Sequence, residues 1–174
     1  MFFKILSVTF LILGAYSAQA LTITDERGQV EAALPQGWSY EKNLFGLPHV
    51  FLSPEGSDRA SFSITLTGIG DVQLPVKELN KNQGQYQEGR KKWAASREFT
   101  ITKFVPYKTL SSNKIQTHVI GVQYKDKKNI EYLEMSYFTE CQDSLVHSKA
   151  VGTLNTEKMK AALKIIDSLR CLKK

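Results

Sequence analysis

The sequence predicts an α+β fold, in which a mainly antiparallel β-sheet packs against two main helices. Segments with strand-like alternation come in two groups, and each group is followed by one segment with helical spacing. The βαβ alternation of a parallel sheet is therefore absent. Removing the first 20 of the 174 residues leaves 154, a length that suits a single domain from 21 to 174 with its own hydrophobic core.

Four strands are predicted in the first half of the chain. They are residues 21–24, 29–38, 49–53 and 60–68, with a turn at 25–28 and a break at 35–37. In the fourth segment, Phe62, Ile64 and Leu66 alternate with serine and threonine. This alternation is typical of an antiparallel strand with one buried face.

A long amphipathic helix is predicted from Asp71 onward, where the apolar spacing changes from two to three and four. Its stripe contains Val72, Val76, Leu79, Gln83, Tyr86, Arg90 and Trp93. Gly84 and Gly89 weaken the pattern, so a kink or break is expected there. The two glycines in residues 67–75 lack the third glycine and the βαβ setting of a phosphate loop, which favours an ordinary turn.

The second half of the chain predicts consecutive hairpins followed by a helix. The expected strands are residues 98–107, 114–125, 130–140 and 144–152. Asn155 or Thr156 is placed to cap the last helix. The apolar stripe of this helix consists of Met159, Ala162, Leu163, Ile166 and Leu169.

The first 20 residues have the pattern of a secretory signal peptide. A short start carrying Lys4 precedes an apolar run, and the segment ends in the small residues Ala18 and Ala20. Cleavage after Ala20 would make Leu21 the first residue of a secreted or periplasmic protein. The apolar run is shorter than a membrane span, so no stable membrane anchor is expected.

The charge distribution argues against nucleic-acid binding. The formal net charge is +6, and it falls to +5 when Lys4 is removed with the signal peptide. The basic residues are dispersed, with short clusters at 90–92, 125–128 and 173–174, instead of lying on one face with interleaved aromatic residues. Solvated surface is the favoured interpretation, and a weak attraction to an anionic envelope surface is the alternative.

The two cysteines, Cys141 and Cys171, are expected to form a disulfide, because an exported chain folds in an oxidising compartment. The bond would close a loop of about 30 residues, for which the chain-entropy estimate is ~3 to 4 kcal/mol. It would fasten the end of the last helix to a turn of the sheet. A redox-active pair is the weaker alternative, because the C-x-x-C spacing that lowers a thiol pKa is missing.

No catalytic centre, metal site or cofactor site is predicted. The three histidines, His49, His118 and His147, lack the spacing of zinc motifs, although His118 and His147 could meet across the sheet. The G-x-S-x-G motif of α/β-hydrolases is absent. Glu131 and Glu134 would point to opposite faces of a strand, so they are poor candidates for a glycosidase pair.

One aromatic group is a candidate binding surface. It contains Trp38, Tyr40, Phe45 and Phe51, which could bind carbohydrate or peptide. Packing in the core is the favoured explanation of these residues, because such side chains supply much of the apolar area of a small domain.

The segment "LPQGW" closing an early strand, the long helix after the fourth strand, the run of hairpins and the ending "IIDSLRC" resemble the PsbP/Mog-type family of α/β/α sandwiches. This resemblance implies a fold and a binding or accessory role instead of catalysis, and it provides no catalytic residues to transfer. The cysteine pair departs from the general family pattern.

Three functional hypotheses follow from the sequence. The first is an exported, non-catalytic binding or accessory protein of the cell envelope, with an envelope protein as its partner. The second is a carrier that encloses a small apolar ligand such as a lipid between the sheet and the long helix. The third and weakest is a nonstandard hydrolase with His118 or His147 as its base.

Overall fold

The computed structural model describes residues 19–26, 28–68, 78–112, 115–141 and 144–172. The strands are β1 (Gln19–Asp25), β2 (Gly28–Leu34), β3 (Ser39–Leu44), β4 (Leu47–Leu52), β5 (Ala60–Gly68), β6 (Thr100–Ser112), β7 (Ile115–Lys125), β8 (Glu131–Cys141), β9 (Ser144–Thr153) and β10 (Arg170–Leu172). The helices are α1 (Gln83–Ser96) and α2 (Glu157–Ser168).

Ten strands form two sheets in the described part of the chain. The large sheet has the order β3-β4-β5-β9-β8-β7-β6, and the small sheet has the order β1-β2-β10. Every strand pair is antiparallel. The predicted α+β class, a mainly antiparallel sheet with two main helices, is therefore confirmed.

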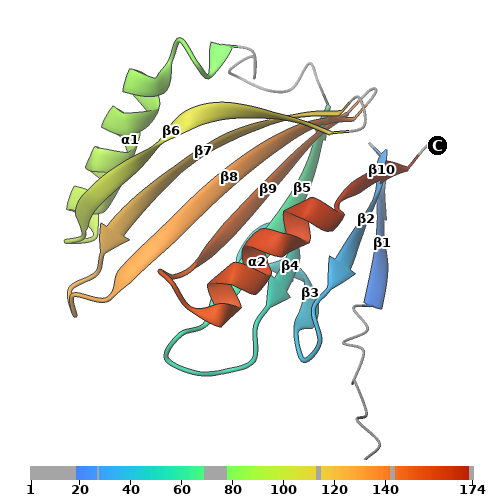
Figure 1. The fold of residues 1–174 in the computed structure, drawn as a ribbon, viewed down its shortest axis with the longest axis horizontal. Helices are drawn as coiled ribbons and strands as arrows, with labels where there is room; N and C mark the ends of the chain where they lie inside the picture. Colours follow the sequence, from blue (N-terminus) through green and yellow to red (C-terminus); the bar gives the residue numbers. More distant parts are fainter. Residues whose placement is uncertain (1–18, 27, 69–77, 113–114, 142–143, 173–174) are drawn as a thin grey trace, which may run out of the picture.

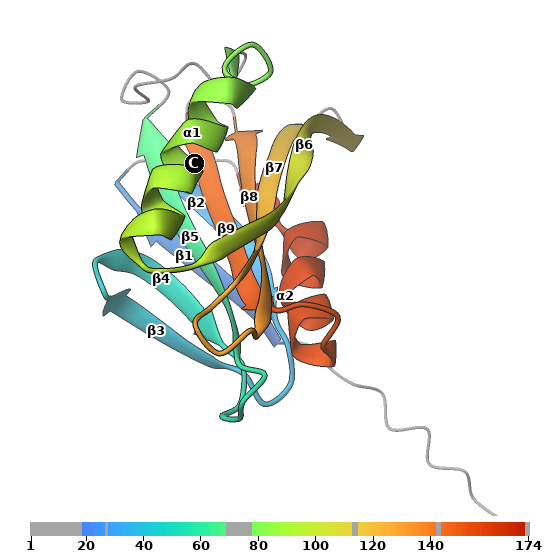
Figure 2. The ribbon, with the colours of Figure 1, turned by 90° about the vertical axis from the view of Figure 1, so that its left-hand side faces the viewer.

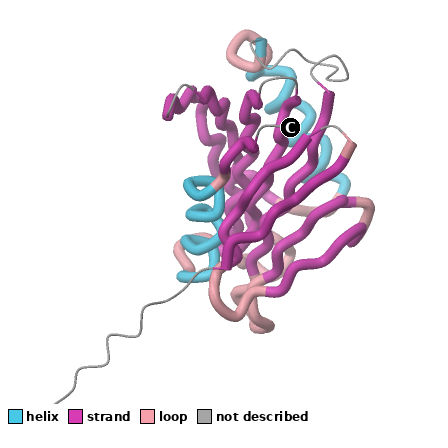
Figure 3. Tube along the Cα trace, turned by 90° about the vertical axis from the view of Figure 1, so that its right-hand side faces the viewer, coloured by secondary structure: helices cyan, strands magenta, loops and turns pink. Residues whose placement is uncertain are grey.

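The two helices cover opposite faces of the large sheet (Figures 1 and 2). Seen from the other side, the strands again lie between the two helices (Figure 3). We call the two faces the α1 face and the α2 face. The small sheet shares the α2 face, and its Ile23, Val30 and Ala32 belong to the same apolar core as Phe62 and Ile165.

Strand periodicity explains why the two faces differ. Phe62, Ile64 and Leu66 of β5 are all buried on the α2 face, as their spacing predicts. The residues between them, Ser63 and Thr65, point to the α1 face. The core therefore lies on the α2 side of the sheet.

Two short strands were not predicted. Strand β3 is an edge strand in which only Tyr40 and Leu44 are half-buried, so its sequence shows little alternation. Strand β10 is three residues long and follows α2 directly. Its pairing with β2 places Cys171 opposite Val30. The prediction that Cys171 ends the last helix was wrong for this reason.

Helix α1 begins later than predicted. Gln83 is its first residue, and Leu79 lies in the turn segment 78–82. The expected positions Val72 and Val76, and the turn around Gln73, lie outside the described residues. The helix runs unbroken through Gly84 and Gly89, so the kink expected at these glycines does not occur.

Candidate functional site

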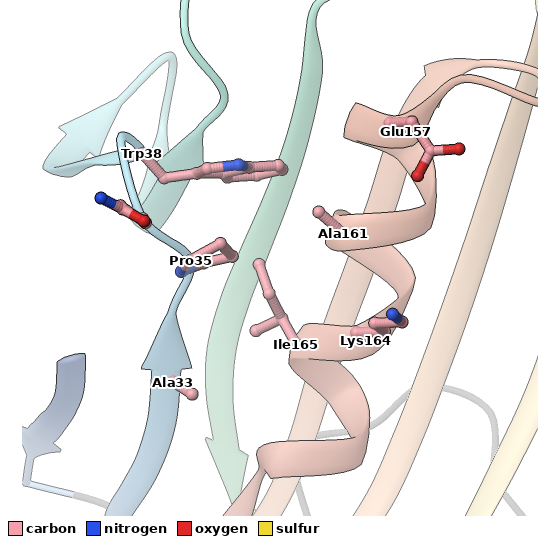
Figure 4. Close-up of a pocket in the computed structure, with 8 residues that line it drawn as sticks. Ala33, Pro35, Trp38, Glu157, Ala161, Lys164 and Ile165 are labelled. Carbon is pink, nitrogen blue, oxygen red and sulfur yellow. The ribbon is translucent and has the colours of Figure 1, made fainter. Parts of the chain in front are cut away.

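An open groove lies between the end of β2 and helix α2 (Figure 4). Its volume is about 890 Å³. We call it the Trp38 groove. Its lining consists of Ala33, Pro35, Gln36, Trp38, Glu157, Ala161, Lys164 and Ile165.

One wall of the Trp38 groove is the turn Pro35–Trp38. The backbone N–H of Trp38 donates to the carbonyl of Pro35 at 3.1 Å, which closes the turn. Gly37 has a φ of +77°, a conformation that favours glycine at this position of a turn. Trp38 is only 9% exposed, so the turn fixes a large aromatic ring in the wall of the groove.

Helix α2 forms the opposite wall. Thr156 caps the helix by accepting a hydrogen bond from the backbone N–H of Met159 at 3.2 Å. Met159, Ala162 and Ile165 are buried on its inner side. Ala161 is half-buried and faces Trp38 in Figure 4, and its small side chain leaves space between the two walls.

A hydrogen-bond relay connects the two walls near one end of the groove. The backbone N–H of Ala33 donates to Ser168 Oγ at 2.9 Å, and this hydroxyl donates to the carbonyl of Ile165 at 2.7 Å. The relay joins β2 to the last turn of α2. The spacing of the groove walls is therefore set by the fold without any ligand.

The rim of the groove carries one charge of each sign. Glu157 and Lys164 are both exposed, and neither lies between the apolar side chains of Trp38 and Ile165. The hydrogen bond from Lys160 at 2.6 Å holds the pKa of Glu157 below its usual value. The Glu157 carboxylate is thus ionised at neutral pH, and the site combines an apolar interior with two side chains of opposite charge.

Cys141 and Cys171 form a disulfide with a Cα–Cα distance of 5.7 Å. It joins the end of β8 in the large sheet to β10 in the small sheet. The bond therefore fastens the two sheets to each other beside α2. Cys141 is itself part of the buried core.

A second polar cluster lies beneath helix α1. Glu134 of β8 is 7% exposed and forms ion pairs with Arg90 of α1 at 3.0 Å and Lys149 of β9 at 3.3 Å. The Arg90 guanidinium also lies 3.7 Å above the ring of Trp93. Burial, together with the nearby Glu134 carboxylate, raises the pKa of Tyr86 to about 12. This cluster attaches α1 to the sheet.

The histidines do not form a joint site. His118 and His147 lie in one row across the sheet, but Phe138 pairs with both and separates them. The Phe138 and His147 rings stack at 4.5 Å. His118 Nδ1 lies 2.6 Å from the Tyr107 hydroxyl, and its Nε2 lies 3.5 Å from a Glu140 oxygen.

His49 lies on the other side of the sheet and is buried beside Tyr40, whose hydroxyl is 2.7 Å from His49 Nδ1. Burial lowers the pKa of His147 to about 4, and the charge of Lys149 acts in the same direction.

Within the described ranges, no three His, Cys, Asp or Glu side chains gather as a potential metal site. No helix among the described residues is long and apolar enough to span a membrane.

The four aromatic residues proposed as a binding surface lie in three different settings. Phe51 is fully buried and Trp38 nearly so, which agrees with core packing, although Trp38 also borders the groove. Tyr40 is half-buried against Phe51, with ring centroids 5.5 Å apart. Phe45 is 93% exposed at the β3–β4 turn. These side chains do not form one exposed surface.

Sequence reasoning identified Trp38 but not the residues that face it across the groove. Ala161 and Ile165 lie more than 120 positions from Trp38, and only the packing of α2 brings them together. The available signal was the Pro-x-Gly-Trp turn combined with a small residue beside the apolar stripe of the last helix. That signal does not specify which segments meet.

Solved structures with the same fold are found. Cyanobacterial PsbP (CyanoP) from Synechocystis sp. PCC 6803 aligns with a TM-score of 0.59 and 14% identity over 91% of this chain and 96% of that chain. LpqN of Mycobacterium tuberculosis, described as involved in cell envelope biogenesis, aligns with a TM-score of 0.56 and 14% identity over 89% and 91%. The chain therefore has a PsbP-like fold, which confirms the predicted resemblance at the level of architecture.

The sequence itself gives no corresponding match. No protein-family model and no curated protein sequence matches the chain.

Proposed function

We propose that this protein is an exported, non-catalytic binding or accessory protein of the cell envelope, and that the Trp38 groove receives an apolar segment of its partner. The groove is the observation that carries this proposal. It combines preformed walls, an aromatic side chain and a charged rim, as protein recognition sites commonly do.

Export is supported by the sequence of the first 20 residues and by the disulfide between the two sheets. Cleavage after Ala20 would leave strand β1 starting at Leu21, with its pairing to Ala32 intact. The measured mass of the protein from its native compartment tests this step. A chain that still contains residues 1–20 would contradict cleavage.

The groove is tested by placing a charge inside it. Ala161→Glu puts a carboxylate between the two walls, and Ala95→Glu makes the same change on an exposed position of α1. Crosslinking and capture from native envelope should recover a partner with the unmodified protein and with Ala95→Glu. With Ala161→Glu, the amount of captured partner should fall at least about tenfold, because an unpaired charge would be buried at the interface.

The capture experiment has two contradicting outcomes. Equal recovery with both glutamate variants would remove the groove from the proposal. Repeated recovery of no partner, together with a robust turnover activity of the purified protein, would contradict the binding role itself. Thermal unfolding of both variants checks that neither change disrupts the fold.

A carrier of a small apolar ligand is the second candidate function. The groove volume of about 890 Å³ lies within the ~300 to 1,000 Å³ that small-molecule sites usually occupy. The lining residues Trp38, Pro35 and Ile165 are apolar. Native mass spectrometry of protein purified from its own host should then show a retained ligand that Ala161→Glu releases, and a single apo mass would exclude this candidate.

A further inference from the structure

The turn between β3 and β4 places an exposed aromatic residue, Phe45, in a backbone conformation that disfavours it. Phe45 and Gly46 form the two-residue connection, flanked by the pair Leu44 and Leu47. Both connecting residues have positive φ, +52° and +78°. Such a hairpin turn favours asparagine followed by glycine, because asparagine tolerates the left-handed region and a bulky aromatic residue does not.

Phe45 gains no packing in return for this strained conformation. Its side chain is 93% exposed, and Leu47 beside it is 39% exposed. An asparagine at this position would suit both the positive φ and the exposure to solvent. A residue that suits neither the positive φ nor the exposure to solvent, and that gains no packing, indicates a function in binding another molecule.

A groove of about 440 Å³ lies next to Phe45 on the α1 face. We call it the hairpin groove. Phe45, Leu52, Tyr132 and Val151 supply apolar surface to it. Among the residues that the structure describes, Arg59 is the only charged one in this lining, which contains no lysine, aspartate or glutamate. This composition matches the core of protein–protein interfaces, where aromatic residues and arginine are enriched and other charges are depleted.

Arg59 provides the electrostatic specificity of the hairpin groove. It is exposed, and it forms no ion pair with any residue in the described parts of the chain. An arginine beside an apolar groove is matched by a carboxylate that approaches together with an apolar side chain. A lipid surface would favour a cluster of several lysines or arginines around the apolar tip.

We propose that Phe45 and the hairpin groove form a docking surface for a protein segment that presents an apolar side chain beside a carboxylate. The inference rests on the proposed binding role, but it concerns a different surface from the Trp38 groove. Phe45 is the apolar anchor, Tyr132 and Val151 line the receiving groove, and Arg59 pairs with the carboxylate.

A random 12-residue peptide library displayed on phage, selected on the immobilised mature protein, tests this proposal. Selected peptides should combine an apolar residue with a nearby aspartate or glutamate. Phe45→Asn should weaken their binding by about tenfold or more, while the favourable turn residue keeps the hairpin folded. Arg59→Glu should reverse the preference, so that a repeated selection enriches lysine or arginine. Ala95→Glu, at an exposed position of α1 outside both grooves, is the control and should retain binding.

Several outcomes would overturn the inference. These are the absence of enriched peptides, binding unaffected by Phe45→Asn, or acidic selection retained by Arg59→Glu. Flotation with phosphatidylglycerol vesicles that depends on Phe45 would assign the tip to a lipid surface instead. A dimer abolished by Phe45→Asn in analytical ultracentrifugation would assign it to a second copy. If Ala161→Glu abolishes capture of the envelope partner and Phe45→Asn leaves it intact, the docking surface at Phe45 is rejected and the proposed function is retained.

Discussion

Helices α1 and α2 lie on opposite faces of the same sheet but are held by different interactions. Helix α2 buries Met159, Ala162 and Ile165 in the core, and Thr156 caps its first turn. Helix α1 buries only Ala94 and has no side-chain cap. Its main attachment is the ion pair from Arg90 to Glu134, together with Trp93, which packs on Tyr124 with ring centroids 5.1 Å apart.

Strand β8 contributes alternate residues to the two faces of the sheet. Met135 and Glu134 are neighbours on β8, but Met135 joins the apolar core while Glu134 is buried among charges. Burial of apolar area is a dependable source of stability, whereas a buried ion pair is largely offset by desolvation. The α2 face therefore provides the more rigid wall for a binding groove.

The largest loss of stability should come from removing the disulfide on the α2 face. Changing Cys141 and Cys171 together to alanine should lower the free energy of unfolding by about 3 to 4 kcal/mol, because the bond closes a 30-residue separation. Urea unfolding of the double variant and the oxidised protein measures this. A change below about 1 kcal/mol would show that the sheets are joined without the bond.

Truncating Ile165 should cost nearly as much. Ile165 is 2% exposed, and Ile165→Ala should destabilise the protein by about 3 kcal/mol through lost burial and a residual cavity. Leu110→Ala is the control, since Leu110 is 43% exposed and its truncation should cost under about 1 kcal/mol. Equal effects in thermal unfolding would contradict the assignment of the core to the α2 face.

On the α1 face, Glu134→Gln should cost about 2 kcal/mol. The change removes the one negative partner that Arg90 and Lys149 have among the described residues, although their partial exposure reduces the penalty. Glu131→Gln on the same strand should cost under about 0.5 kcal/mol, because within the described part of the chain the Glu131 carboxylate accepts only an exposed hydrogen bond, from Thr102. A Glu134 effect no larger than that of Glu131 would mean that the ion cluster does not hold α1.

The smallest of these effects should be a pH dependence from the α1 face. Folding lowers the pKa of His147 from 6.5 to about 4, so the unfolded chain binds more protons between these values. The stabilising contribution should be complete above about pH 7, and the free energy of unfolding should fall by about 1 to 2 kcal/mol as the pH drops to between about 5.5 and 5. His147→Gln should remove this difference in urea unfolding at several pH values. Identical pH profiles would contradict the burial of a neutral histidine.

The sequence predicted the parts of the fold that depend on periodicity. The α2 stripe and the alternation of β5 required only local patterns, and Gln83, Tyr86, Arg90 and Trp93 were placed correctly on one face of α1. Strands β3 and β10 were missed because a short edge strand carries little alternation. The partners of Trp38 were missed because local patterns do not specify which distant segments pack together.

Phe45 and Phe51 show the same limit within one hairpin. Both are aromatic residues near a Gly or Pro, but Phe51 lies within β4, between β3 and β5, and is fully buried, whereas Phe45 lies in the turn and is exposed. Residue type alone did not separate them. The turn sequence Phe45-Gly46 was the informative signal.

The most direct test of the central claim uses a photo-crosslinking amino acid placed in the native host. Lys164 on the rim of the Trp38 groove and Lys92 on α1 are both exposed lysines on a helix, so they form a matched pair. If the groove on the α2 side receives an envelope partner, irradiation should give a discrete crosslinked species from position 164 and none from position 92. Crosslinks from position 92 alone, or equal crosslinks from both, would contradict the account.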